Sequence, residues 1–320
     1  MAFVPIVVPA FAALVFFGVN VSVRAVAPLP AMEPRGGPQQ SPLFRAGVDL
    51  VNIGVTVTDR KGQLVTGLGP EDLEIYEDGR KQTISVFLAG NAAAAAAEMH
   101  LGVLLDVSES MGEDIRFTRT AAIKFLNTLT DAVDVTVVDF DTEVRAARFS
   151  QNEFARLVER IRQQKTTGMT ALYDAIGVYL DGAGGQTGRK VMLLYTDGGD
   201  TQSSLRFNEL LDLLKASDVT VYAVGALEHQ SGVARERARS ILQTIAETTG
   251  GKAFFPTTVK ALDDMYDKVV AEVRAQYTIG YVSTNTRTDG AWRKVEIRPR
   301  NRRDMTLRAR KGYFGPYKKP

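Results

Sequence analysis

Between residues 99 and 276, short apolar runs alternate with longer amphipathic stretches, and this alternation constrains the fold more than any other feature. The runs MHLGVLLDV, RKVMLLYTD and DVTVYAVGA are apolar almost throughout, which is typical of strands buried on both faces of a sheet. The stretches between them, such as EDIRFTRTAAIKFLNTL, have the spacing of helices with one apolar face. The pattern predicts an α/β domain over residues 99–276, with a doubly wound, mostly parallel sheet and helices on both faces.

The segments on either side of this domain have β character instead. Residues 45–90 contain the alternating segment VDLVNIGVTVT and the short strands LVTGL and EDLEIYEDGRKQTISVFL. Residues 277–320 contain three alternating segments, YTIGYVS, WRKVEIRP and DMTLRARKGYF. Either part alone would bury too little surface to be stable. We therefore expect both parts to form one β-sandwich-like module, into which the α/β domain is inserted after an alanine-rich junction at residues 91–98.

The N-terminal region has the composition of an export or anchoring segment. Residues 1–23 carry no charge, and they are followed by Arg24 and the small-residue triplet AVA. No Lys or Arg precedes this stretch, which departs from the usual export signal, and the stretch is long enough to span a bilayer. We predict a signal peptide or membrane anchor over residues 1–27 and a Pro/Gly-rich linker over residues 28–44. The protein is expected to be exported to the periplasm or the cell exterior, or to be anchored in the inner membrane of a bacterium.

The composition excludes several functional classes. The absence of cysteine excludes disulfides, thiolate nucleophiles and Cys-ligated zinc, and His100 and His229 are the only histidines. A formal net charge of +2 is too small to argue for nucleic acid. The tail from residue 287 is rich in Lys, Arg and aromatic residues, but a solvated sheet face explains it better than an anion-binding surface. Asp139 and Asp141 are interpreted as exposed acids at a hairpin turn.

Three loops at the predicted carboxyl edge of the sheet carry oxygen-bearing side chains. The motif DVSES follows the first strand of the domain and supplies Asp106, Ser108 and Ser110. Thr170 precedes the helix ALYDAIGVYL, and Asp197 follows a later central strand. Ligands of open parallel sheets bind beyond the carboxyl ends of the strands. Two carboxylates and three hydroxyls, without histidine or thiol, suit a hard divalent cation.

Each loop also has a purely structural interpretation. Ser110 with Glu113 fits S-x-x-E, a helix capping box. Thr170 would serve as a helix N-cap, and Asp197 begins an ordinary Asp-Gly-Gly turn. Taken singly, each structural interpretation is favoured, whereas the combination of all five residues at one edge favours a metal site.

The motifs DVSES, GMTALYDA and YTDGGD resemble the metal-ion-dependent adhesion site of von Willebrand factor A domains. The flanking words VTVTDRKGQLVTGL and WRKVEIR are similar to those of bacterial exported proteins related to this family. The resemblance implies that Mg²⁺, or Mn²⁺ or Ca²⁺ in its place, binds to the five matching residues, which are Asp106, Ser108, Ser110, Thr170 and Asp197. It also implies that an acidic side chain of a partner protein completes the coordination.

The expected function is that of a Mg²⁺-dependent protein-binding module, of adhesion or scaffold type, at the cell envelope. Nucleic acid is not an expected partner, no catalytic residue is predicted, and the protein is not expected to be an enzyme. One alternative is an assembly factor that works with a ring ATPase, which requires that the N-terminal segment does not direct export. A metal-assisted hydrolase is an alternative because Mg²⁺ can activate water. It is weaker than the others, since the sequence has neither a G-x-S-x-G elbow nor a glycine-rich phosphate loop.

Overall fold

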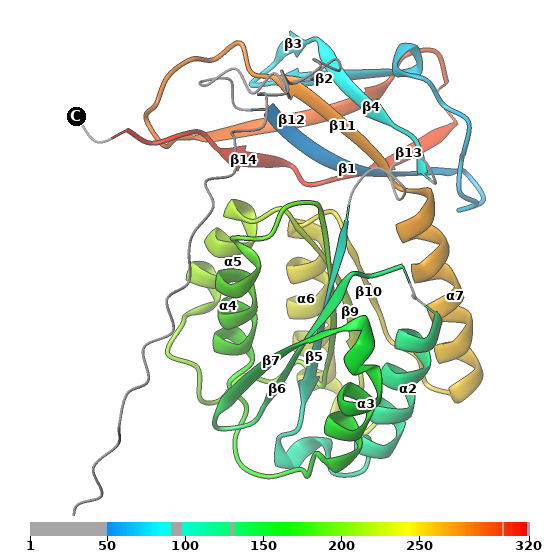
Figure 1. Cartoon of the computed structure of the whole chain (residues 1–320), viewed down its shortest axis with the longest axis vertical. Helices are drawn as coiled ribbons and strands as arrows, with labels where there is room; N and C mark the ends of the chain where they lie inside the picture. Colours follow the sequence, from blue (N-terminus) through cyan, green and yellow to red (C-terminus); the bar gives the residue numbers. More distant parts are fainter. Residues whose placement is uncertain (1–49, 91–97, 129–130, 303, 319–320) are drawn as a thin grey trace, which may run out of the picture. The chain divides into compact units, whose positions relative to one another are not determined.

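The computed structural model describes residues 50–90, 98–128, 131–302 and 304–318 (Figure 1). The predicted signal or anchor, the linker and the six consecutive alanines lie outside these residues. Within the described ranges, no helix combines the length and the apolar character that are needed to cross a bilayer.

The α/β domain is built around a six-stranded sheet with the order β10-β9-β8-β5-β6-β7, in which only β7 is antiparallel to its neighbour. This architecture confirms the predicted fold class. Its elements are β5 (Met99–Asp106), α2 (Ile115–Thr128), β6 (Asp134–Phe140), β7 (Val144–Ser150), α3 (Phe154–Gln163), α4 (Leu172–Ala183), β8 (Arg189–Thr196), α5 (Phe207–Ala216), β9 (Val219–Gly225), α6 (Gly232–Thr248), β10 (Lys252–Phe254) and α7 (Val259–Ala275), with short 3-10 turns at Glu109–Met111 and Gln151–Glu153.

Both faces of the sheet are covered by helices, which explains the uninterrupted apolar strands. Helices α2, α3 and α7 pack on one face, and α4, α5 and α6 pack on the other (Figure 1). In β5, Leu101 and Val103 belong to the first core and Leu104 belongs to the second. Gly102 lets α4 approach closely, since a Cβ atom there would lie 2.3 Å from the ring of Tyr179. Each large apolar side chain buried in this way stabilises the fold by about 1.5–3 kcal/mol.

The connections to the strands on the two sides of β5 run in opposite directions across the sheet. The candidate site lies where these connections diverge. From β5 the chain proceeds through α2 to β6 on one side, and it returns through α4 to β8 on the other side. In doubly wound sheets, the crevice for ligands lies at such a reversal of strand order. Asp106 ends β5 and Thr196 ends β8, so both residues lie at this crevice.

The N- and C-terminal segments together form two antiparallel sheets, as predicted. One sheet has the order β13-β1-β11-β4 and the other has the order β14-β12-β2-β3. Strand β11 from the C-terminal segment is therefore central between two N-terminal strands, and β12 is central in the other sheet. The elements are β1 (Leu50–Asp59), a 3-10 turn (Pro70–Asp72), β2 (Leu73–Glu77), β3 (Arg80–Gln82), β4 (Ile84–Leu88), β11 (Tyr277–Val282), β12 (Trp292–Pro299), β13 (Met305–Arg308) and β14 (Gly312–Phe314).

Two strand predictions in the β module are wrong. LVTGL contributes only an isolated bridge between Thr58 and Leu64. DMTLRARKGYF is not one strand, because β13 pairs with β1 in one sheet and β14 pairs with β12 in the other. The residues between them are held by the α/β domain. Arg310 donates to the carbonyl oxygen of Ser217, and Gly250 has a positive φ and no room for a Cβ atom beside the Ala309 backbone.

A buried polar network lies inside the β module. The carboxylate of Glu77 accepts hydrogen bonds from the hydroxyls of Tyr281 (2.8 Å), Tyr313 (2.8 Å) and Ser283 (2.6 Å). The guanidinium of Arg293 lies 3.9 Å from the same carboxylate and donates to Ser283 Oγ at 3.1 Å. Glu77 and Arg293 each have only 2% exposure, so the carboxylate and the guanidinium depend on each other and on these hydroxyls.

Candidate metal centre

The loop after β5 brings three of the predicted ligands into one chain of contacts. The Oδ1 atom of buried Asp106 accepts hydrogen bonds from the backbone nitrogen (3.0 Å) and the hydroxyl (2.5 Å) of Ser108. Ser108 Oγ lies 3.2 Å from Ser110 Oγ. Asp106 and Ser108 are buried whereas Ser110 is exposed, so the polar chain leads from the sheet core to the surface.

The loop after β8 contacts the same carboxylate from the other side. Thr196 Oγ1 donates to Asp106 Oδ2 at 2.6 Å and accepts from the backbone nitrogen of Gly198 at 3.0 Å. The neighbouring Asp197 is buried, and its backbone oxygen accepts from Gln230 Nε2 at 2.7 Å. The sequence analysis missed Thr196, although its place at the end of a buried strand, directly before Asp197, is a signal that could have identified it.

Backbone hydrogen bonds tie the Thr170 loop to the loop that carries Asp197. The nitrogen of Thr170 donates to Thr201 Oγ1 at 3.0 Å, and the nitrogens of Thr201 and Gln202 donate to the oxygen of Thr170 at 2.9 and 3.0 Å. The Thr170 side chain is buried. The chain of bonds therefore fixes the second loop against the third.

The same segment is also bonded to the first loop. The nitrogen of Glu109 donates to the oxygen of Gly168 at 3.1 Å, and the nitrogen of Thr167 donates to the oxygen of Val107 at 2.9 Å. All three loops that carry predicted ligands thus belong to one hydrogen-bonded unit at the carboxyl edge of the sheet.

Two of the structural interpretations of these loops are wrong. The N-cap of α4 is Ala171 and not Thr170. Ser110 lies within a 3-10 turn, and α2 begins only at Ile115, so Ser110 does not cap that helix. The turn at Asp197 does form, since Gly199 N donates to its Oδ1 at 2.9 Å. Helix capping therefore does not account for the Ser110 and Thr170 side chains.

The two acids of the β6–β7 hairpin are buried and paired, and their interpretation as exposed acids is wrong. Arg145 donates through Nε to Asp139 (2.6 Å) and through two further nitrogens to Asp141 (3.0 Å each). The Asp141 backbone oxygen accepts from the nitrogen of Ala171 at 2.8 Å. Arg145 therefore pairs with both carboxylates. By holding Asp141, it also supports the loop that carries Thr170.

The electrostatics of Asp106 fit a bound cation. Burial raises the pKa of Asp106 to about 7, the hydrogen bonds from Ser108 and Thr196 oppose this effect, and the nearby charge of Asp197 adds to it. A divalent ion between Asp106 and Asp197 would offset the free-energy cost of burying two negatively charged carboxylates. In the described part of the chain, no group of three His, Cys, Asp or Glu residues is placed to hold a metal, so a cation here depends on hydroxyl ligands.

This pKa predicts how stability changes with pH in the metal-free protein. Between the ordinary aspartate pKa near 4 and the folded value of about 7, the folded state holds the proton of Asp106 and the unfolded state releases it. The contribution of Asp106 to stability is therefore largest below this window and falls as pH rises through it, by about 1.4 kcal/mol per pKa unit. Urea unfolding in EDTA at pH 4 to 8 measures it. In Asp106→Asn this contribution should vanish, and equal pH slopes in the two proteins would contradict the expectation.

Comparison with known proteins gives a family and several structural relatives. The family model for the von Willebrand factor type A domain matches residues 100–268. The comparison with curated proteins returned no match. The PilB minor pilin from Streptococcus sanguinis is similar, with 13% identity and a TM-score of 0.46 over 56% of this chain and 62% of the pilin. This chain thus spans less than two thirds of that protein.

Two further solved structures show similar levels of likeness. The vWF domain of the type V pili tip protein Mfa5 from Porphyromonas gingivalis has 11% identity and a TM-score of 0.46 over 55% of this chain and 96% of that domain. A von Willebrand factor type A protein from Catenulispora acidiphila has 14% identity and a TM-score of 0.45 over 86% of this chain and 75% of that chain.

Proposed function

This chain belongs to the von Willebrand factor type A domain family, and from that membership we propose that it is a Mg²⁺-dependent protein-binding module, of adhesion or scaffold type, at the cell envelope. The observation that carries the proposal is the chain of contacts from Ser110 through Ser108 and Asp106 to Thr196. It places carboxylate and hydroxyl oxygens at the crevice where a sheet of this topology binds ligands.

In this proposal the metal is held by the five predicted residues, which are Asp106, Ser108, Ser110, Thr170 and Asp197. Their oxygen atoms are the ligand type that Mg²⁺ prefers, and Mn²⁺ or Ca²⁺ are the substitutes. When bound, the ion supplies a positive centre that attracts an anionic oxygen. Thr196 is a positioning residue, since its hydroxyl bonds to Asp106 Oδ2 and orients that carboxylate.

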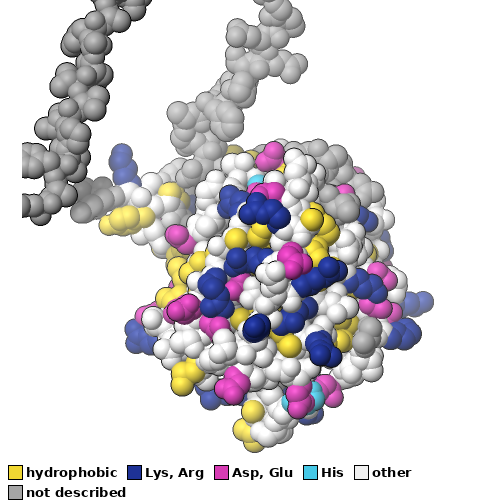
Figure 2. Space-filling model, turned by 60° about the horizontal axis from the view of Figure 1, so that its bottom comes forward, with side chains coloured by type: hydrophobic (Ala, Val, Ile, Leu, Met, Phe, Trp, Pro, Cys, Tyr) yellow, Lys and Arg dark blue, Asp and Glu magenta, His cyan; other side chains and the backbone are white. Residues whose placement is uncertain are grey.

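The proposed partner is a protein that offers an acidic side chain. Three of the five ligands are neutral hydroxyls, so the ion keeps its capacity to attract a further carboxylate. The carboxyl ends of the parallel strands lie at the bottom of Figure 1, and in Figure 2, where this side comes forward, Lys and Arg side chains are interspersed with acidic ones. Segments next to the three loops carry the exposed cations Arg116, Lys165 and Arg206. On this mixed surface, the charge of the bound ion would be what favours an acidic partner.

Calorimetric titration tests the metal site. We expect a chain that begins at residue 45 to bind Mg²⁺ and Mn²⁺, and we expect Asp106→Ala to lose this binding because the carboxylate that bonds to Ser108 and Thr196 is removed. The control is Asp264→Ala, an exposed carboxylate on α7 whose partner is Lys260. Metal binding that survives in Asp106→Ala would refute the assignment.

Partner capture and cell fractionation test the proposed acidic partner and the proposed location at the cell envelope. Acidic proteins retained by the wild-type chain in Mg²⁺ should be released by EDTA and should be absent with Asp106→Ala. Export, which rests on the sequence of residues 1–27, predicts the protein in the envelope or outside the cell. Recovery from the cytoplasm together with a ring ATPase would point to the assembly-factor alternative instead.

A further inference from the structure

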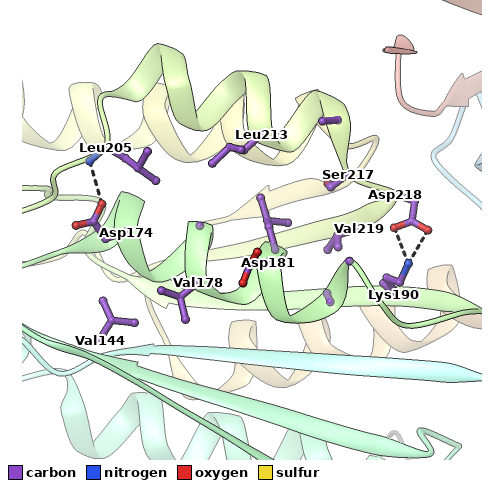
Figure 3. A pocket seen from close by; sticks show the side chains of 15 residues that line it. Val144, Asp174, Val178, Asp181, Lys190, Leu205, Leu213, Ser217, Asp218 and Val219 are labelled. Atoms are coloured by element: carbon purple, nitrogen blue, oxygen red, sulfur yellow. Dashed lines mark hydrogen bonds and ion pairs between the residues drawn. The ribbon is translucent and has the colours of Figure 1, made fainter. Parts of the chain in front are cut away.

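A second surface lies over α4, on a part of the domain that the metal centre does not use. It is a groove of about 1070 Å³, and Figure 3 shows the side chains that line it. We call it the α4 groove, and we define it by three apolar and three acidic residues, which are Val178, Leu205, Leu213, Asp174, Asp181 and Asp218.

The apolar part of the α4 groove is formed by two helices and the loop that joins α5 to the metal edge. Val178 on α4 is 44% exposed and Leu213 on α5 is 41% exposed, which is high for side chains of this type. Gly177 leaves room for Leu205, because a Cβ atom there would lie 2.8 Å from Leu205 Cδ1. Val178 and Leu213 are therefore two exposed apolar side chains at the groove that a partner could cover.

The charged part of the groove is negative. Lys190 donates to both carboxylate oxygens of Asp218 at 2.8 Å, so these two charges compensate each other. Asp174 accepts only backbone hydrogen bonds, from Ser204 (2.8 Å) and Leu205 (2.9 Å), which leave its charge in place.

Asp181 is the second uncompensated acid of the groove. It is exposed and has no ion-pair partner among the described residues. Arg148, the cation that reaches this end of α4, donates to the backbone oxygen of Gly182 instead. Asp174 and Asp181 are seven residues apart on one helix, which places them about 10 Å apart along its axis.

We propose that the α4 groove binds a basic amphipathic helix of a partner protein. Apolar side chains of that helix cover Val178 and Leu213, and cations two turns apart lie over Asp174 and Asp181. Helix α4 spans Leu172–Ala183, about 18 Å, so the matching partner segment has about 12 residues. Recognition of an amphipathic helix through apolar anchors at spacings of three and four residues is a recurring mode of peptide binding. The groove and the metal centre would then engage different chemistry, a cationic helix and an acidic side chain.

Binding of two designed peptides to the full chain tests the proposal by fluorescence anisotropy. One is a labelled 14-residue helical peptide with two Lys residues seven positions apart and Leu residues on the same face, and the other carries Glu in place of each Lys. We expect the Lys peptide to bind and the Glu peptide to bind at least tenfold more weakly. Asp181→Lys should abolish this preference, because each peptide then meets one attractive and one repulsive charge while Asp174 keeps its own. The double variant Val178→Ser with Leu213→Ser should weaken the Lys peptide at least tenfold.

Further controls separate this site from folding defects and from the metal centre. None of the substituted side chains of the groove is buried, and unchanged thermal unfolding of the variants shows that the fold persists. Asp106→Ala should bind the Lys peptide as the wild type does, with EDTA or with Mg²⁺, so the proposal survives even if the metal assignment fails. Absence of Lys-peptide binding, a preference that persists in full in Asp181→Lys, or loss of binding in Asp106→Ala would overturn it.

Discussion

Deletion of residues 277–320 is expected to unfold the β module while the α/β sheet stays intact. Strand β11 pairs with β1 over six residues, Leu50–Val55, and pairs with β4 on its other side. Its residues Tyr277, Ile279 and Tyr281 have at most 1% exposure, so the deletion removes the centre of the sheet and of its core. The remaining strands could form only small hairpins, which are marginally stable in water.

Limited proteolysis measures this effect. In the truncated chain, residues 50–88 should be cut rapidly, whereas the same segment in the full chain should be protected. Removal of residues 318–320 alone is the control, because these residues follow the last strand. If residues 50–88 stayed protected after the long deletion, the N-terminal segment would be a domain of its own.

The substitution Glu77→Ala is expected to destabilise the β module by about 3–5 kcal/mol, because it leaves a buried guanidinium without its carboxylate. It also removes the acceptor for three hydroxyls, those of Tyr281, Tyr313 and Ser283. Burial and the hydrogen bond to Glu77 raise the pKa of Tyr281, so this hydroxyl remains a donor throughout the accessible pH range.

Urea unfolding compares this variant with a matched one on a neighbouring strand. Glu296→Ala removes the carboxylate paired with Arg298, an exposed pair of the kind that contributes about 0–1 kcal/mol. Equal losses of unfolding free energy in the two variants would show that burial does not increase the contribution of the Glu77 contacts to stability.

The order of strands and helices could be predicted because it depends on local periodicity. Buried strands such as β5 have no polar face, and four of the five candidate ligands lie at or just after strand ends, where topology alone brings loops together, while Thr170 lies in the α3–α4 loop. The metal itself stays a prediction, because hydrogen bonds among its proposed ligands do not identify a bound ion.

Features that depend on contacts distant in the sequence could not be predicted. One alternating segment serves two sheets because Arg310 and Ala309 contact the α/β domain between β13 and β14. Asp139 is buried because Arg145 and Arg160 both pair with it, the latter from α3. Val178 and Leu213 occupy apolar positions of amphipathic helices and are indistinguishable in sequence from core residues, although they are exposed.

The direct passage from α7 into β11 has a mechanical consequence. Only Gln276 separates the end of the helix at Ala275 from the strand that begins at Tyr277. Leu50 pairs with Val282, and Val55 pairs with Tyr277. The first residue of β1 and the first residue of β11 therefore lie at opposite ends of the β1–β11 ladder. Tension between the N-terminal side of β1 and the α/β domain would therefore load this ladder in shear. Its backbone hydrogen bonds would have to break together rather than one after another.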